Sequence, residues 1–293
     1  TQSRSSAASD VYKRQAYAAS ASQAHERGRV VGAAQGGVFI GLLLARVFAG
    51  AVGDLAGWRG VYACSALLML ALAWLLWRQL PRLAVPLHAP SYTQLLASML
   101  QLLRQDRMLR TRGMLALLMF ATFNIFWSAL VLPLSAPPYS LSLTAIGAFG
   151  LAGVVGALAA ARAGHWADQG FAQRTSLGAL VILLLAWAPI ALLEQSLWAL
   201  VAGIVLLDLG GQALHVTNQS LIFRSNPQAH SRLVGLYMLF YAVGSGLGAL
   251  IATNAYARFG WHGVCVAGAA FSLAALVFWA MTRETAAQAS VPA

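Results

Sequence analysis

One apolar stretch of the sequence carries polar side chains that could bind a polar solute or pass on a proton. It lies near residue 210, and its polar members are Asp208, Gln212, His215 and Gln219. Their spacing of four, three and four residues places them on one face of an α-helix. An ionisable side chain at the centre of a bilayer costs about 2.5 to 3.5 kcal/mol, so such residues face a partner or a wet cavity.

Two uses of this polar stripe stay open. In the first, the stripe lines a translocation path, and Asp208 and His215 relay a proton, because imidazole titrates near neutrality. In the second, the same residues form a hydrogen-bond network between helices that fixes their helix in place.

Arg46 is a second costly group in an apolar segment. It could pair with Asp208 across a cavity, extend toward Asp54 and the outer face, or pair with a carboxylate outside this chain. A tryptophan in such a segment more often lies in a core or at the membrane interface than at a substrate site. The remaining candidates for substrate contact are Asn124 and Trp127, with Thr122.

The elements that carry these residues are predicted to be membrane-spanning helices. Hydrophobic residues make up 59% of the chain and charged residues 9%, and the mean hydropathy is +0.69. Apolar runs of about 20 residues are long enough to cross a bilayer as helix. The sequence thus predicts an all-α integral membrane protein with eight spans, at about 31–53, 58–78, 113–134, 143–164, 175–193, 197–222, 233–255 and 261–281.

The first two predicted spans recur as the last two. A shift of 203 positions superposes Arg29 on Arg232, and the block that begins at Gly57 and Trp58 falls on Gly260 and Trp261 without a gap. Long internal repeats are typical of transporters built from duplicated bundles. We therefore expect residues 16–78 to end one six-helix half whose first four helices are missing, 79–111 to be a linker, 112–285 to form the second half and 286–293 to be a tail.

Residues 1–15 differ from the rest of the sequence. They are polar and unpatterned, and they hold Lys13, the one lysine beside 18 arginines. We interpret this segment as a non-native scar rather than a signal peptide, since it has no apolar core. Cys64 and Cys265 lie in apolar runs, where packing is expected and neither a disulfide framework nor a metal site is indicated.

Arginines predict the orientation. Thirteen of them fall in loops on one side of the predicted spans and two, Arg59 and Arg258, on the other. Positively charged loops stay in the cytoplasm, so the linker and the C-terminus are expected there. This topology, and not nucleic-acid binding, explains the net charge of +11.

The linker contains an amphipathic segment. Leu95, Leu96, Met99, Leu102 and Leu103 recur at helical spacing among polar residues. Such a helix could lie in the membrane interface, or it could be part of a solvated tether between the halves. In the first case, anionic lipid would meet the arginines at 104, 107, 110 and 112.

The loop between the fourth and fifth predicted spans reads GHWADQG and is followed by Arg174. Gly164 and Gly170 allow a tight turn, and Asp168 could accept hydrogen bonds at the start of the next helix and attract Arg174 or Arg162. Asp168 would then be either a conformational latch or an ordinary helix cap. Glycines on the first, fourth and seventh spans suit either sliding contacts or static packing.

The loop motif, the basic linker and the parallel six-helix repeats resemble the major facilitator superfamily. Within it, the segments RVFAG at 46–50 and DLGGQ at 208–212 are similar to bacterial efflux permeases of the arabinose-efflux and drug:proton-antiporter type. The resemblance implies a major facilitator-type bundle with eight of twelve helices, numbers five to twelve, present. It further implies a monomer in the bacterial inner membrane that exports a small organic solute, such as a drug or sugar, by alternating access. The proton gradient would drive export, with no cofactor.

Other classes of function are less compatible with the sequence. The sequence has no G-x-x-x-x-G-K-[ST], no H-E-x-x-H and no G-x-S-x-G, so ATP-driven pumps and common hydrolases are excluded. An intramembrane enzyme that uses Asp208 and His215 remains an alternative, as does a transport-incompetent fragment or a sensor. The duplicated unit favours a transporter, because enzymes have no need of two rocking halves.

Overall fold

A computed structural model describes residues 27–79, 92–225 and 230–288 of the chain. All regular structure in these residues is helical. The helices are α2 (Arg27–Gln79), α3 (Tyr92–Gln105), α4 (Arg107–Ala129), α5 (Val131–Ser135), α6 (Leu143–Trp166), the π-helix η2 (Ala167–Phe171), α7 (Ala172–Leu185), α8 (Trp187–Ala191), α9 (Leu197–Ser225) and α10 (His230–Gln288).

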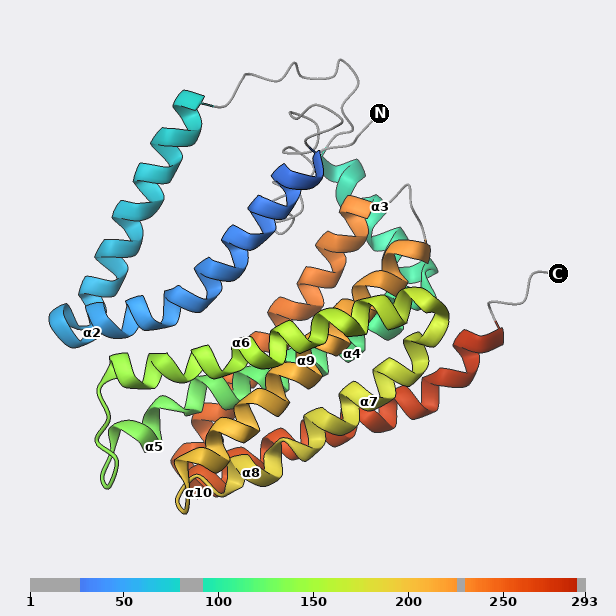
Figure 1. The fold of residues 1–293 in the computed structure, drawn as a ribbon. Coiled ribbons are helices and arrows are strands. Elements are labelled where there is room, and N and C mark those ends of the chain that lie inside the picture. The colour runs from blue at the N-terminus through green and yellow to red at the C-terminus, as the bar shows by residue number, and fades with distance from the viewer. Residues whose placement is uncertain (1–26, 80–91, 226–229, 289–293) are drawn as a thin grey trace.

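Two of these helices are folded back on themselves. Helices α2 and α10 contain one residue each with left-handed backbone geometry, Gly57 (φ 66°) and Gly260 (φ 60°). These two positions are the pair that the repeat superposes, and only glycine adopts this geometry without strain. Each glycine divides its helix into two arms, so eight long helical segments of the described chain match the eight predicted spans (Figure 1).

Prolines explain why two spans are interrupted. Helix α4 ends at Ala129 and α7 ends at Leu185, each four residues before a proline, Pro133 in α5 and Pro189 in α8. A proline ring clashes with the carbonyl four residues earlier and removes a helical hydrogen bond. The predicted spans 113–134 and 175–193 are therefore each a long helix followed by a short one.

The helices run back and forth between two ends of the bundle. We call the end that holds Gly57 and Gly260 the turn end. The opposite end, where α3 lies, is the linker end. Five apolar segments of the described residues are long enough to cross a membrane, and the two longest, Leu44–Gln79 and Arg232–Arg283, contain the glycine turns.

Tryptophans join α7 and α8 to the second arm of α10. The Nε1 group of Trp187 donates to Ser272 (3.0 Å), that of Trp261 to the carbonyl of Ile190 (3.0 Å) and that of Trp279 to Gln173 (3.1 Å). All three indoles are almost fully buried. Cys265 is buried in the same cluster, so its predicted packing role is confirmed.

Small residues bring other helices into backbone contact. A Cβ atom at Gly244 or Gly248 on α10 would meet the carbonyl of Leu117 or Ala121 on α4, whereas Gly246 faces open space. A Cβ atom at Gly50 on α2 would likewise collide with the carbonyl of Leu143 at the start of α6. Glycine packing thus holds α4 against α10 and the first arm of α2 against α6.

The linker helix α3 packs onto the linker end of the bundle. Met99, Leu102 and Leu103 lie against a buried cluster that includes Leu233 and Tyr237 of α10. Leu96 and Leu100 remain exposed, while the side chain of Leu95 is outside the described part. The predicted amphipathic helix therefore exists, and it is docked rather than a free tether.

Arg112 corrects one sequence-based expectation. The sequence places it among the linker arginines that could meet anionic lipid, whereas its side chain is only 2% exposed. The reason is that α4 begins at Arg107, six residues before the predicted span, so Arg112 already lies inside the bundle.

Candidate functional site

Arg46 and Asp208 approach each other from different helices near the middle of the bundle. The guanidinium of Arg46 on α2 stacks over the ring of Trp127 on α4, 3.5 Å from its centroid. It also attracts the carboxylate of Asp208 on α9 electrostatically. Among the described residues the two groups do not form a direct ion pair, and Oδ2 of Asp208 is buried without a hydrogen-bond partner.

Helix α6 leaves room for both of these charged groups. Gly150 lies against the side chain of Arg46, and Gly153 lies against the carboxylate of Asp208. A Cβ atom at Gly153 would collide with Oδ2 of Asp208, so any larger residue would displace the carboxylate. The glycines of α6 therefore have a specific place at the site in addition to their packing.

His215 lies seven residues after Asp208 on α9, closer to the linker end. It belongs to a polar and aromatic cluster. Its Nδ1 is 2.9 Å from the hydroxyl of Tyr237, and its Nε2 is 3.1 Å from Nε2 of Gln219. The ring of Phe120 meets the imidazole edge to face at 5.3 Å and the ring of Tyr241 at 4.0 Å. These contacts join α9 to α4 and α10.

The predicted stripe on α9 is therefore divided between two environments. Asp208 faces α2 and α6, whereas His215 and Gln219 interact with each other and with α10. Gln212 lies between them and is half-buried. No chain of hydrogen bonds in the described residues joins Asp208 to His215, so a direct proton relay between them is not formed in this conformation.

The candidates on α4 take different positions. Trp127 lies under Arg46, and its Nε1 is buried without a partner. Asn124 donates to the hydroxyl of Ser245 on α10 (3.0 Å) and to the carbonyl of Phe120 (3.0 Å). Thr122 is fully buried and bonds Leu118 of its own helix, so it offers no group to a ligand here.

The structure rules out one partner for Arg46 in this conformation. Asp54 accepts hydrogen bonds from the backbone N–H groups of Leu143 (2.8 Å) and Thr144 (2.8 Å) and from the Thr144 hydroxyl (2.6 Å). Its carboxylate therefore caps the start of α6 and does not pair with Arg46. This contact also joins α2 to α6 at the turn end.

Sequence reasoning missed a buried arginine. Arg112 donates to the hydroxyl of Ser176 on α7 (3.0 Å) and to Oδ1 of Asn218 on α9 (3.4 Å). Its Nε and the Nδ2 group of Asn218 are buried without partners. Arg112 immediately precedes the predicted span 113–134, and this boundary position is the one signal that the sequence offers.

The loop motif is described in part. The side chain of Asp168 and the surroundings of Gly164 lie outside the described residues. Gly170 has a φ of 93° inside η2, as expected for a turn, and the guanidinium of Arg174 lies 5.6 Å from the ring centroid of Phe171. The proposed attraction between Asp168 and Arg174 stays a prediction.

Comparison with known proteins identifies one family and several bacterial relatives. The sequence profile of the Major Facilitator Superfamily matches residues 14–230 and, in a second match, residues 157–293. The uncharacterized transporter YgaY of Escherichia coli is 43% identical over 262 residues in strain K12 and 42% identical over 262 residues in O157:H7. Both alignments cover 89% of this chain and 66% of the relative, so the chain spans just under two thirds of these relatives.

A more distant relative comes from another bacterium. The protein named "Probable transporter SCO4007" of Streptomyces coelicolor is 30% identical over 248 residues. That alignment covers 84% of this chain and 57% of the relative.

Proposed function

The chain belongs to the Major Facilitator Superfamily, and on that premise we propose that the whole protein is a secondary active transporter. It exports a small organic solute, such as a drug or sugar, in exchange for protons. Membership of a transporter family, together with relatives named as transporters, argues against the alternative of an intramembrane enzyme.

The observation that carries this proposal is the arrangement of Arg46 and Asp208. They lie on α2 and α9, which the repeat assigns to different halves of the bundle. Asp208 has one buried oxygen without a donor, and Arg46 is attracted to it without a direct ion pair. A buried carboxyl of this kind can take up and release a proton, and each change alters the attraction that draws the two halves together.

Solute binding is proposed for the space between the same elements. Trp127 supplies an aromatic face under Arg46, and Asn124 and Gln212, one turn from Trp127 and from Asp208 on the same helices, supply amide groups. His215 and Gln219 extend the polar surface toward the linker end. An aromatic face with few polar groups suits a compact organic molecule better than a polymer.

The contacts at the turn end support one access state. Helices α2 and α6 meet there through Gly50 and Asp54, and Figure 1 shows them side by side at that end and diverging toward the start of α2. We assign the linker end to the cytoplasm from the distribution of arginines. We propose that this contact closes the outward side of the bundle. The protein is then a monomer in the inner membrane of a bacterium, with its C-terminus in the cytoplasm.

The loop motif at the linker end would govern the opposite state. We propose that Gly170 forms the turn and that Asp168, with Gly164 and Arg174, closes the cytoplasmic side when the turn end opens. The left-handed backbone of Gly170 supports the first part.

Asp208→Asn in the full-length protein tests the proposal. Proteoliposomes containing a pH-sensitive dye would report proton movement on addition of ethidium, as a cationic drug, or arabinose, as a sugar. We expect the variant to insert normally and to lose solute-driven proton flux, while Glu194→Gln, which removes an exposed acid at the turn end, retains it. Transport with unchanged pH dependence in Asp208→Asn would remove Asp208 from the mechanism.

A further inference from the structure

Arg112 carries a positive charge into the interior of the bundle at the linker end. Its side chain is buried, and its two hydrogen bonds, to Ser176 and Asn218, go to neutral groups. Among the described residues no carboxylate forms an ion pair with it. Transfer of a charged group out of water is costly unless an opposite charge accompanies it. The described residues leave this charge uncompensated.

The hydrogen-bond donors around this charge are only partly used. Both hydrogen bonds of Arg112 leave from Nη1, while its Nε and the Nδ2 group of Asn218 are buried without an acceptor. Nε and Nη2 form one edge of the planar guanidinium, and this edge is suited to hold an anion through two parallel N–H groups. Buried polar groups without partners are rare in native proteins. An anion that accepts from these donors would explain them together.

The groups that face Arg112 from neighbouring helices add no negative charge. The Ser176 hydroxyl donates to the carbonyl of Ala172 (2.8 Å), so it is available to Arg112 only as an acceptor. The hydroxyl of Tyr237 on α10 interacts electrostatically with the guanidinium, but a phenol is neutral near pH 7. The same hydroxyl lies 2.9 Å from Nδ1 of His215, whose imidazole can only add positive charge. The described surroundings of Arg112 are therefore neutral or cationic.

The position of Arg112 favours a small ion over an organic anion. Ser176 and Asn218 are fully buried, and they hold the guanidinium of α4 between α7 and α9. The carbon skeleton of an organic solute would have to pass between these packed helices, whereas a halide needs only the unpaired N–H groups. Chloride is the commonest halide in aqueous media.

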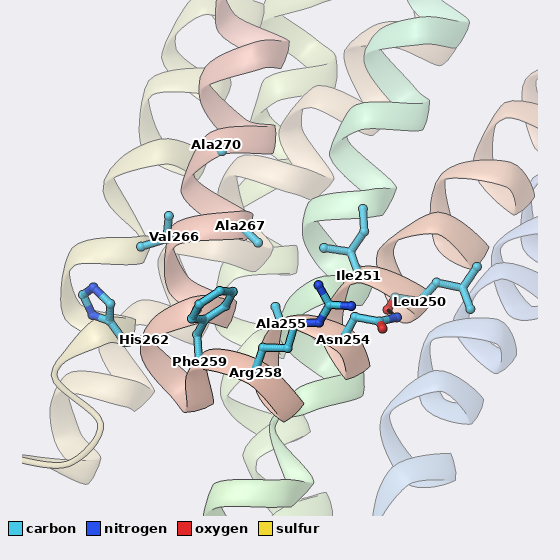
Figure 2. Close-up of a pocket in the computed structure, with 11 residues that line it drawn as sticks. Leu250, Ile251, Asn254, Ala255, Arg258, Phe259, His262, Val266, Ala267 and Ala270 are labelled. Atoms are coloured by element: carbon cyan, nitrogen blue, oxygen red, sulfur yellow. Dashed lines mark hydrogen bonds between the residues drawn. The ribbon is translucent and has the colours of Figure 1, made fainter.

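The groove between the two arms of α10 provides a contrast. It lies beside the Gly260 turn, at the opposite end of the bundle, and Figure 2 shows residues such as Ile251, Val266 and Ala267 along it. Its lining surface is almost wholly apolar, so it offers an anion no comparable set of donors.

We propose that Arg112 and Asn218 bind a chloride ion between α4, α7 and α9 at the linker end. The ion accepts from Nε and Nη2 of Arg112 and from Nδ2 of Asn218, and it neutralises the buried guanidinium. Chloride thereby stabilises the contact between the start of α4 and the end of α9. The site is separate from Arg46 and Asp208, so it does not depend on the proposed transport mechanism.

Thermal unfolding of the purified chain in detergent tests the site. Sodium chloride would replace sodium gluconate stepwise at constant ionic strength. We expect a saturable rise of about 2–4 °C in the melting temperature of the wild type, because a ligand that binds only the folded state stabilises it. Arg107→Gln is the matched control, since Arg107 is an exposed arginine on the same helix and its loss should leave the rise unchanged.

Two variants replace the anion or remove its donors. Asn218→Asp supplies a fixed negative charge beside the guanidinium, so in gluconate it should melt no lower than the wild type, and it should no longer respond to chloride. Arg112→Met combined with Asn218→Leu removes the unpaired donors. In gluconate this double variant should be at least as stable as the wild type, and chloride should not raise its melting temperature.

The results that would overturn the proposal are distinct. One is a melting temperature of the wild type that chloride does not raise, and another is a full rise in either variant at Asn218. Loss of the rise in Arg107→Gln would place the effect at the surface of the protein. A rise with sodium formate but none with chloride would identify a carboxylate site. Either of these results would also overturn it.

Discussion

The carboxylate of Asp54 caps the first residues of α6 through Thr144, with the hydroxyl 2.6 Å and the backbone N–H 2.8 Å from Oδ2. This contact joins two helices that the sequence repeat assigns to different halves of the protein. A carboxylate at a helix N-terminus satisfies unpaired N–H groups and interacts favourably with the helix dipole. It is therefore suited to hold the turn end closed and to release it when the halves separate.

Removal of this cap should open the turn end. In Asp54→Ala the backbone N–H groups of Leu143 and Thr144 no longer have the carboxylate as acceptor and must bond to water instead. The closed form therefore loses stability relative to the open form. Spin labels on Leu55→Cys and Ala148→Cys, in a background without Cys64 and Cys265, would report the separation of α2 and α6 by double electron–electron resonance. We expect a longer distance to gain population.

Two variants calibrate this measurement. Thr144→Val keeps the backbone donors and loses only the hydroxyl, so its effect should be smaller. Glu194→Gln removes an exposed acid elsewhere at the turn end and should leave the distances unchanged. If Asp54→Ala gave the wild-type distribution, the cap would not control the separation of the helices.

Gly50→Ala should destabilise the chain. The added methyl group would collide with the carbonyl of Leu143, and overpacking of this kind typically costs about 1–3 kcal/mol. Thermal unfolding in detergent would measure the change. Gly41→Ala is the control on the same helix, since nothing lies within 4 Å of its Cβ position. Equal melting temperatures for the two variants would show that the contact with α6 is not tight.

The two tryptophans that the repeat relates should respond differently to the same change. Trp261 is 6% exposed and donates to Ile190, whereas Trp58 is 64% exposed and stacks under Arg59. Trp261→Phe removes one of two donors to the Ile190 carbonyl, which also accepts from the N–H of Leu193 (3.3 Å), and should cost about 0.5–1.5 kcal/mol. Trp58→Phe should change stability by less than about 0.5 kcal/mol. Thermal unfolding of both variants would test this difference, and a similar loss in each would contradict it.

Arg112 and its partner Asn218 should tolerate apolar substitution only when both are replaced. Asn218→Leu leaves Arg112 with Ser176 as its one remaining acceptor, which should cost about 1–3 kcal/mol. Arg112→Met combined with Asn218→Leu also removes the two unpaired donors and should be at least as stable as wild type. Denaturation of both variants would decide the matter. A double variant less stable than Asn218→Leu would show that the charge itself stabilises the fold.

Most of the fold follows from the sequence because apolar length and repetition are strong signals. The shift of 203 positions that superposes Gly57 on Gly260 located both turns correctly, and their backbone angles agree. The predicted spans 113–134 and 175–193 run past Pro133 and Pro189, whereas α4 and α7 end four residues before these prolines and short helices follow. The length of an apolar run can be determined from the sequence alone, so helix lengths can be predicted without knowledge of how the helices pack.

The site was harder to predict because it depends on which faces meet. The stripe from Asp208 to Gln219 was found by its spacing, but the contact of His215 with Tyr237 requires the position of α10. The sequence pattern places Arg112 in the linker, because a positive charge beside an apolar run normally marks the boundary of that run. The cap on α6 by Asp54 joins residues about 90 positions apart in sequence, and no local pattern indicates it.

The meeting of Gly50 with the carbonyl of Leu143 has a mechanical consequence. At that point the two halves touch through backbone atoms, so no side chain can be compressed or change its rotamer. A junction of this kind acts as a fulcrum, because it keeps its spacing while the helices on either side tilt. At Gly41 on the same helix a side chain would meet open space, whereas at Gly50 only a hydrogen atom fits.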